Sequence, residues 1–443
     1  MKNQIKINQT IKPFDKKIFI PSDKSLSIRC ILLASIAVGK SKIYNILESE
    51  DVFHTLEAVK KIGIEYIKRR DFIEIYGLGI NGFNLKNRNI FLNAGNSGTL
   101  ARCILGLCSG LESRIKLIGD KSLSKRDFSR VIKPLSMFGV KIKSEKSKLP
   151  LKFTGTALLK PIKYFEDKGS AQIKTCIILS AINTPGITKI KALKSRNHTE
   201  LLLKYLNYPI KVQPNGKYDL ISVKGLNQFK SFDYKVPGDI SSASFFIVLT
   251  LLSKNSTILI KDVNINSSRI GILKILNKMN AKIKITNKRL YKGEDIADIK
   301  VKSIRNLKSI NCPASLNSAS IDEFLLIFLV AAKSKGVSSF KQLGELNKKE
   351  SPRLDLAIKF LNMLGIKTIR KKNDLKIIGN PELRPKGKFH IKNFLKDHRI
   401  FMMSVIAALT IGGQNWKIED KDSINTSFPD FLKIVKNLGA KIL

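Results

Sequence analysis

A serine-rich segment near the N-terminus carries residue types that bind anions. Lys24, Ser25 and Arg29 lie at the start of an apolar-periodic segment, in PSDKSLSIRC. The first turn of a helix offers backbone N–H groups without intrahelical partners, and a lysine and an arginine one turn apart can converge on one anion. The segment therefore predicts an anion site, although serine and lysine at a helix start are also common as ordinary caps.

A second small-residue turn precedes another predicted helix. Residues 96–99, Asn-Ser-Gly-Thr, stand before a helix that carries Arg102. Gly98 has no Cβ, so a ligand can approach the backbone there, while the same turn would also serve as a helix cap. The segment has neither the GxGxxG nor the GxxxxGKS spacing, so neither a dinucleotide nor a P-loop nucleotide is indicated.

Carboxylates in the C-terminal half have ordinary structural explanations when they are taken alone. Asp322 and Glu350 lie near predicted helix starts, where a carboxylate complements the helix dipole, and residues 397–399 (Asp-His-Arg) fit a surface turn. His198 also stands at a helix start and is expected to be structural, and Asp239 is expected to cap a helix.

The elements that must position these residues belong to a chain of more than one domain. It has 443 residues, of which 43% are hydrophobic, so two or three domains are expected. The longest apolar runs, 245–252 and Phe324–Ala332, are shorter than the roughly 20 residues that cross a bilayer and predict buried helices. The polar, lysine-rich start of the chain predicts neither a signal peptide nor an anchor, so a cytoplasmic protein is expected.

The formal charge of +45 raises the question of nucleic-acid binding. Lysines are scattered along the chain without a basic arm or an aromatic-interleaved basic stretch, so no nucleic-acid partner is predicted. The positive field would speed the encounter with small anionic substrates. Five cysteines without a CxxC pair and four dispersed histidines indicate reduced thiols and no metal site.

One pattern recurs six times: an amphipathic helix, a turn residue, a short alternating strand and often a second strand. The turn residues are Gly63, Gly139, Pro209, Asn280, Gly365 and Gly439. Glycine and asparagine enter the left-handed region at a helix end easily, whereas Pro209 fits this position poorly. Six α/β units, arranged as two domains of three, are the predicted architecture, with ligands between the domains.

Ten segments follow one another from Pro21 to Leu443: PSDKSLSIR, LNAGNSGTLAR, GDKSLSKRDFSRVIKPL, GSAQIKTCIILSA, SRNHTELLL, VPGDISSASFF, IDEFLLIFLVAA, LNKKESPRL, DHRIFMM and NTSFPDFLKIVKNLGAKI. In this order they resemble the signature blocks of the 5-enolpyruvylshikimate-3-phosphate synthase family. Ten ordered blocks are far more specific than any one of them.

The resemblance implies an inverse α/β barrel-like enolpyruvyl transferase fold of two domains, each with three βαβαββ-type units. An N-terminal globular domain would span 24–239, and a C-terminal globular domain would combine 1–23 with 240–443. The active site is then expected in the cleft between the domains.

The resemblance also implies the substrates and the residues that bind them. For shikimate 3-phosphate, the implied positions are Lys24, Ser25, Arg29, Ser170, Ala171, Gln172, Ser195, Asp322 and Lys349. For phosphoenolpyruvate, they are Lys24, Gly98, Arg126, Gln172, Arg353 and Arg399. Arginines and a lysine suit a ligand that carries both carboxylate and phosphate, and hydroxyls and cations suit a sugar-like phosphate.

The implied reaction joins the 5-hydroxyl of shikimate 3-phosphate to C2 of phosphoenolpyruvate and then expels phosphate. Asp322 is expected to act as base for the 5-hydroxyl, Glu350 to exchange the proton at the methylene carbon, and Lys24 to stabilise the leaving phosphate and shuttle a proton. No metal or organic cofactor and no partner protein is expected, and a monomer is predicted.

Three positions depart from the family pattern. Pro352 stands where an aspartate is usual, Asp127 replaces a proline after Arg126, and Thr426 stands where one branch of the family has a lysine. Pro352 is compatible with the first turn of a helix, so Arg353 can still be aimed, and Asp127 is expected to face solvent.

Two other functions stay open at this stage. The sister enzyme that acts on UDP-N-acetylglucosamine carries a Lys-Asn pair and a loop cysteine, and this chain has Lys24–Ser25 and SLSKRDF at those places. A non-catalytic anion-binding or nucleic-acid-binding protein on the same scaffold is the other alternative, because fold does not fix function.

Overall fold

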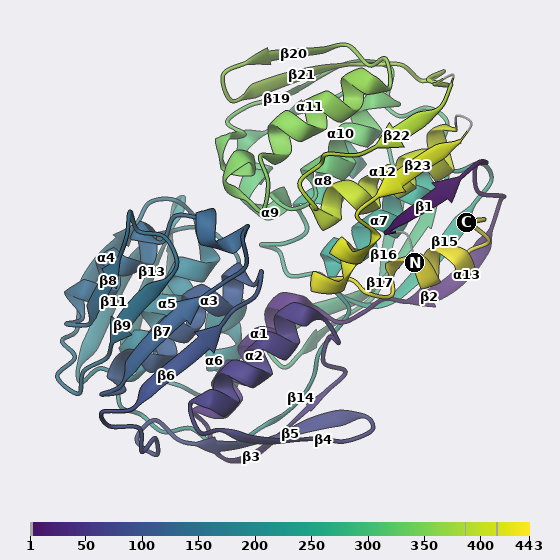
Figure 1. Ribbon diagram of the computed structural model, residues 1–443. Coiled ribbons are helices and arrows are strands. Elements are labelled where there is room, and N and C mark those ends of the chain that lie inside the picture. Colours follow the sequence, from purple (N-terminus) through teal and green to yellow (C-terminus); the bar gives the residue numbers. More distant parts are fainter. Residues whose placement is uncertain (1–2, 386, 413–414) are drawn as a thin grey trace. The chain divides into compact units, whose positions relative to one another are not determined.

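In the part of the chain that the structure describes, helices alternate with short strands, and the strands form six small sheets (Figure 1). The structure is a computed structural model, and it describes residues 3–385, 387–412 and 415–443. The chain divides into two compact units. Unit 1 comprises Met1–Pro21, Gly238–Arg289 and Asp295–Leu443, and unit 2 comprises Ser22–Pro237 and Leu290–Glu294.

Unit 2 contains three four-stranded sheets, in the strand orders β14-β3-β5-β4, β6-β7-β9-β8 and β10-β11-β13-β12. Its strands are β3 (Val38–Tyr44), β4 (Glu65–Lys68), β5 (Phe72–Leu78), β6 (Asn89–Asn93), β7 (Arg114–Ile118), β8 (Lys141–Ser144), β9 (Leu151–Thr154), β10 (Lys163–Glu166), β11 (Ile187–Leu193), β12 (Ile210–Asn215), β13 (Tyr218–Lys224) and β14 (Asp233–Lys235). Its α-helices are α1 (Lys24–Ser35), α2 (Glu50–Lys61), α3 (Gly98–Leu107), α4 (Ser129–Met137), α5 (Ala171–Ile182) and α6 (His198–Tyr205).

Unit 1 contains the sheets β16-β17-β15-β2, β18-β19-β21-β20 and β1-β23-β22. Its strands are β1 (Gln4–Ile7), β2 (Asp15–Phe19), β15 (Thr257–Asn264), β16 (Lys282–Tyr291), β17 (Glu294–Lys302), β18 (Asn311–Cys312), β19 (Gly336–Phe340), β20 (Thr368–Lys371), β21 (Asp374–Gly379), β22 (Phe389–Ile391) and β23 (Trp416–Glu419). Its α-helices are α7 (Ile240–Leu252), α8 (Gly271–Lys278), α9 (Asn317–Ser320), α10 (Phe324–Ala332), α11 (Arg353–Met363), α12 (His398–Ile411) and α13 (Phe431–Asn437).

Every sheet repeats one hydrogen-bonding plan, which confirms the predicted sixfold repeat. In each sheet one parallel strand pair (β14 with β3, β6 with β7, β10 with β11, β2 with β15, β18 with β19, β22 with β23) adjoins antiparallel neighbours. The two apolar runs of the sequence lie in the helices α7 and α10, and nearly all residues of these helices are buried. A helix that is apolar on all sides has no face for water, so both lie at the centre of unit 1.

The turn residues of the repeats follow the prediction with one correction. Gly63, Gly139 and Asn280 have φ values of 92°, 104° and 70°, and Gly365 and Gly439 are also left-handed. In the third repeat the left-handed residue is not Pro209 but Asn207, with φ 55°. The proline ring fixes φ near −65°, so Pro209 cannot take the left-handed conformation. Asn207, two residues earlier, takes it instead, because asparagine tolerates the left-handed region.

The tip of the β16–β17 hairpin belongs to unit 2, although both strands belong to a sheet of unit 1. Tyr291 packs edge-on against Tyr234 with ring centroids 5.7 Å apart, and Glu294 Oε1 lies 2.6 Å from His198 Nδ1. Gly293 has φ 88°, and a Cβ there would lie 2.8 Å from the carbonyl oxygen of Leu201. His198 is therefore a buried structural residue, as predicted.

In the described part of the chain, no helix combines the length and the apolar character that a membrane span requires. The five cysteines are buried and unbridged.

Candidate active site

The anion site predicted at the first helix is built on the N-terminus of α1. Asp23, which is fully buried, caps the helix by accepting a hydrogen bond from Leu26 N at 2.9 Å. Lys24 Nζ lies 2.7 Å from Asp51 Oδ2, and this carboxylate comes from α2. The lysine is therefore held by a buried carboxylate, while about a fifth of its side chain stays exposed (22%).

Arg29 lies one turn further along α1 and is buried. Its Nε donates to Thr199 Oγ1 at 2.9 Å and its Nη2 to Thr175 Oγ1 at 3.1 Å, while Nη1 donates to the carbonyl oxygen of Ser25 at 2.9 Å. The two threonine hydroxyls are 2.7 Å apart. Arg29 thus joins α1 to α5 and α6, the two helices that begin next to the other predicted phosphate residues.

Two guanidinium groups converge at the glycine of the second predicted turn. Nη1 of Arg102 and Nη1 of Arg126 would each lie 2.8 Å from a Cβ built on Gly98. Arg102 donates to Gln172 Oε1 at 2.9 Å, and Gln172 Nε2 donates to Thr99 Oγ1 at 3.1 Å. Two like charges that converge on one glycine would be stabilised by an anionic ligand between them.

The segment GSAQ begins α5 and presents its polar residues at the helix start. Ser170 caps the helix by accepting from Ile173 N at 3.4 Å, and Ala171 and Gln172 follow in the first turn. The hydroxyl of Ser195 is buried without a hydrogen-bond partner among the described residues. Because buried hydroxyls are nearly always hydrogen-bonded, this one fits a position that a ligand completes.

In unit 1, a buried guanidinium organises three carboxylates. Arg353, at the start of α11, is only 1% exposed. Its Nε lies 2.9 Å from Asp397 Oδ2, its Nη2 lies 2.5 Å from Glu350 Oε2, and its Nη1 lies 3.3 Å from Asp322 Oδ1. The predicted base and the predicted proton carrier are therefore both held by the same arginine.

Two more cations reach the same aspartate. Lys349 Nζ lies 3.4 Å from Asp322 Oδ1, and Arg399 Nη1 donates to the carbonyl oxygen of Asp322 at 3.0 Å. All five residues predicted in this part of the chain thus gather in one cluster, which we call the unit 1 cluster: Asp322, Lys349, Glu350, Arg353 and Arg399. The residues predicted in unit 2 form the unit 2 cluster: Lys24, Ser25, Arg29, Gly98, Arg126, Ser170, Ala171, Gln172 and Ser195.

The charges of the unit 1 cluster reinforce one another. Burial alone would lower the pKa of Arg353, but the carboxylates of Asp397, Glu350 and Asp322 raise it. Burial alone would raise the pKa of Asp397, but the guanidinium of Arg353 lowers it below its usual value. Both groups are therefore kept ionised, as a fixed electrostatic framework requires.

Comparison with known proteins identifies the family of the chain. The profile of EPSP synthase (3-phosphoshikimate 1-carboxyvinyltransferase) matches residues 8–435. The 3-phosphoshikimate 1-carboxyvinyltransferase of Ruthia magnifica subsp. Calyptogena magnifica is 39% identical over 96% of this chain and 95% of its own length. The 3-phosphoshikimate 1-carboxyvinyltransferase of Zymomonas mobilis subsp. mobilis is 36% identical over 98% of this chain and 96% of its own length. The chain belongs to the EPSP synthase family.

Solved structures of the EPSP synthase family agree with this assignment. An EPSP synthase from Acinetobacter baumannii superposes with a TM-score of 0.85 at 32% identity and covers 99% of both chains. The enolpyruvyl transferase NikO from Streptomyces tendae superposes with a TM-score of 0.74 at 13% identity, which shows a shared fold alone. The predicted enolpyruvyl transferase fold and the predicted family are confirmed.

Several expectations for this EPSP synthase family member need correction or gain detail. Residues 397–399 do not form a surface turn, because Asp397 is buried, caps α12 and accepts a hydrogen bond from Ser351 Oγ at 2.6 Å. Pro352 is the residue before α11 and leaves Arg353 aimed into its carboxylates. Asp127 is exposed and binds Ser129 N at 2.8 Å, as expected for a carboxylate turned to solvent.

Sequence reasoning missed three residues that the structure places at the two clusters: Asp51, Arg102 and Asp397. Arg102 was recognised as part of the second turn, but its approach to Gln172 depends on the packing of α3 against α5. Asp51 lies 27 residues after Lys24, so only the pairing of α1 with α2 brings the two together. Thr426, the third departure from the family pattern, donates to the carbonyl oxygen of Ser423 at 2.9 Å.

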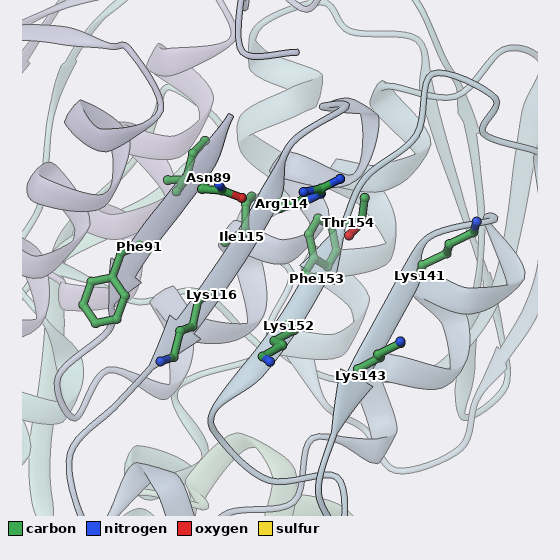
Figure 2. Close-up of a pocket in the computed structure, with 11 residues that line it drawn as sticks. Asn89, Phe91, Arg114, Ile115, Lys116, Lys141, Lys143, Lys152, Phe153 and Thr154 are labelled. Atoms are coloured by element: carbon green, nitrogen blue, oxygen red, sulfur yellow. The ribbon is translucent and has the colours of Figure 1, made fainter. Parts of the chain in front are cut away.

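A shallow pocket on the solvent face of the sheet β6-β7-β9-β8 is separate from both clusters. It is lined by Asn89, Ile90, Phe91, Arg114, Ile115, Lys116, Lys141, Lys143, Lys152, Phe153 and Thr154, and Figure 2 shows the lysines standing on successive strands. None of the predicted site residues lines it. Within the described residues, no group of histidine, cysteine and carboxylate side chains could hold a metal ion.

Proposed function

We propose that the chain transfers the enolpyruvyl group of phosphoenolpyruvate to the 5-hydroxyl of shikimate 3-phosphate, giving 5-enolpyruvylshikimate 3-phosphate and phosphate, in the shikimate pathway to chorismate and aromatic amino acids. The observation that carries the proposal is the unit 1 cluster, in which Arg353 holds Asp322 and Glu350 within 3.3 Å and 2.5 Å. Family membership supplies the reaction class, and this cluster supplies the carboxylates that the reaction needs.

The proposed shikimate 3-phosphate residues are Lys24, Ser25, Arg29, Ser170, Ala171, Gln172 and Ser195 of unit 2, with Asp322 and Lys349 of unit 1. The cationic and hydroxyl groups would bind the 3-phosphate, and the amide of Gln172 would bind ring hydroxyls. Ser195 supports this assignment because its buried hydroxyl would gain a partner from the ligand.

The proposed phosphoenolpyruvate residues are Lys24, Gly98, Arg126, Gln172, Arg353 and Arg399. The convergence of Arg102 and Arg126 at Gly98 supports an anion at that position, and we add Arg102 to the group. Guanidinium groups bind carboxylate and phosphate through two parallel hydrogen bonds, so several of them suit this ligand.

Three residues would divide the proton transfers. Asp322 would accept the proton of the 5-hydroxyl as its oxygen bonds to C2 of phosphoenolpyruvate, while C3 gains a proton and becomes a methyl group. The tetrahedral adduct would then lose phosphate, and C3 would lose a proton to restore the double bond. Glu350 would serve at C3, and Lys24 would stabilise the departing phosphate and shuttle a proton.

The domain arrangement, the oligomeric state and the cellular compartment of the enzyme form part of the same proposal. We place the active site in the cleft between a domain of residues 24–239 and a domain of residues 1–23 plus 240–443. The enzyme would work as a monomer in the cytoplasm, on small molecules and without nucleic acid. The scattered lysines would attract anionic substrates rather than a nucleic-acid backbone.

Phosphate release by the purified protein tests this function. Release should require both shikimate 3-phosphate and phosphoenolpyruvate, and it should fall by about 10² to 10⁴ in Asp322→Ala and in Glu350→Gln. UDP-N-acetylglucosamine serves as the competing acceptor. Folded wild-type protein that releases no phosphate with shikimate 3-phosphate would refute the proposal, and release with the UDP-sugar alone would reassign the acceptor.

A further inference from the structure

Three charged side chains lie buried behind the proposed shikimate 3-phosphate residues of unit 2. Glu166 ends β10, Lys174 lies in α5, and Glu200 lies in α6. Glu166 and Glu200 are each 2% exposed and Lys174 is completely buried, so none is placed to bind a ligand directly. We call these three residues the buried charge group.

Glu166 shapes the turn that leads into α5. Its carboxylate accepts the backbone N–H of Lys168 and that of Ser170, each at 3.1 Å. Gly169, between them, takes the left-handed conformation with φ 67°, which lets both amides point at one carboxylate. The position of Ser170 at the start of the helix therefore depends on Glu166.

Lys174 and Glu200 connect the two helices that follow the proposed phosphate residues. Lys174 Nζ lies 2.6 Å from Glu200 Oε1. Lys174 is two residues after Gln172 on α5, and Glu200 is five residues after Ser195. The ion pair thus fixes the distance between the segment that carries Gln172 and the segment that carries Ser195.

The electrostatics connect the same three side chains. Burial raises the pKa of Glu166, while its backbone hydrogen bonds and the charge of Lys174 act in the opposite direction. Lys174 pairs with Glu200, and its charge also favours the ionised form of Glu166. A buried ion pair contributes little net stability compared with well-packed apolar residues of the same volume, but it fixes geometry because an apolar contact has no preferred direction.

We propose that Glu166, Lys174 and Glu200 are positioning residues for shikimate 3-phosphate, which hold Ser170, Gln172 and Ser195 at the spacing that the substrate requires. The inference rests on the proposed function, since it assigns a role in binding one of its two substrates. Phosphoenolpyruvate shares only Gln172 of the three residues that are held, and its proposed arginines lie elsewhere, so its binding should be affected much less.

The test replaces the ion pair by apolar residues of similar volume in the full chain, as Lys174→Met with Glu200→Leu. We expect urea unfolding to stay close to that of the wild type and the KM for shikimate 3-phosphate to rise by about tenfold. The KM for phosphoenolpyruvate, which shares only Gln172 of the three residues, should rise by less than about threefold, and kcat should change by less than about twofold. The matched control replaces the Lys261–Asp298 pair of β15 and β17 in the same way and should leave both KM values unchanged.

A second variant keeps the test decisive if the double variant does not fold. Glu166→Gln preserves size but offers one acceptor oxygen in place of two, so the KM for shikimate 3-phosphate should rise by about fivefold. An unchanged KM in a folded variant would overturn the positioning role. Isothermal titration of the wild type with shikimate 3-phosphate separates the two proposals: wild-type protein that neither binds it nor turns over refutes the proposed function itself.

Discussion

The unit 1 and unit 2 clusters hold their guanidinium groups in different ways. Arg353 of unit 1 is 1% exposed and lies within 3.3 Å of three carboxylates. Arg102 of unit 2 donates to the carbonyl oxygen of Gly98 at 3.1 Å and to the amide oxygen of Gln172 at 2.9 Å, and lies beside Arg126. Carboxylates therefore position Arg353, whereas the oxygen atoms that accept hydrogen bonds from Arg102 are neutral.

The way in which each arginine is held indicates how its cluster would respond to a ligand. Carboxylates around a buried arginine fix their own positions before any substrate arrives, which suits groups that must move protons. Arg102 and Arg126 instead converge at a glycine, at the position proposed for an anion, whose charge would stabilise both guanidinium groups. Substitutions at Arg353, Arg102, Gly98 and Asp397 test this difference between the two clusters.

The largest effect should follow from removing the central cation of unit 1. Arg353→Gln leaves Asp397 buried without its counter-ion, so the free energy of unfolding should fall by about 3–5 kcal/mol. Arg102→Gln removes hydrogen bonds to neutral oxygens and should cost about 1–2 kcal/mol. Urea unfolding of both variants measures the contrast, and equal losses would show that the two arginines are held alike.

Arg102→Gln should also lower the activity with phosphoenolpyruvate. Because Arg102 converges with Arg126 at the proposed anion position, its loss should lower kcat/KM for phosphoenolpyruvate by about 10- to 100-fold, or about 1.4–2.7 kcal/mol. Steady-state kinetics with each substrate varied in turn would show it. A decrease in kcat/KM for shikimate 3-phosphate alone would show that Arg102 binds shikimate 3-phosphate and not phosphoenolpyruvate.

A methyl group at Gly98 should produce a smaller effect at the same place. The added Cβ of Gly98→Ala would lie 2.8 Å from two guanidinium nitrogens at the ends of flexible side chains, so the protein should fold while the arginines shift. The KM for phosphoenolpyruvate should rise by about tenfold. Gly110→Ala is the control, since its Cβ would meet only side-chain atoms of Asn183, at 3.2 Å, and of Leu159, at 3.7 Å, among its nearest atoms.

Acid should weaken unit 1 through Asp397. The pKa of this carboxyl is lowered in the folded protein, so its contribution to stability is complete above its usual pKa and disappears as the pH falls through the lowered value. Each unit of pKa difference corresponds to about 1.4 kcal/mol. Urea unfolding at a series of acidic pH values should show a shallower decline in Asp397→Asn, and identical slopes would contradict the assignment.

Much of the architecture was predictable because it depends on local signals that repeat. The left-handed glycines and the apolar runs of α7 and α10 each specify their own element, and six copies made the pattern visible. The error at Pro209 was also local, since the neighbouring Asn207 offered an alternative turn residue two positions earlier.

The contacts inside the clusters could not be predicted in the same way. Asp397 is 44 residues from Arg353 and Arg102 is 70 residues from Gln172, and nothing near either residue in the sequence specifies its partner. Family resemblance indicated positions such as Asp322 and Arg353, but it said nothing about Asp397, the buried carboxylate that holds Arg353. Such contacts depend on the packing of whole helices.

The hairpin tip of residues 290–294 has a consequence for how unit 2 acquires its structure. Glu294 reaches His198 across 96 positions of the sequence, and Tyr291 contacts Tyr234. A fragment that ended at Pro237 would lack both contacts and would leave an imidazole and an aromatic ring exposed to water. During synthesis, the core of unit 2 is therefore complete only after residues 290–294, which follow the return of the chain to unit 1 at Gly238, have left the ribosome.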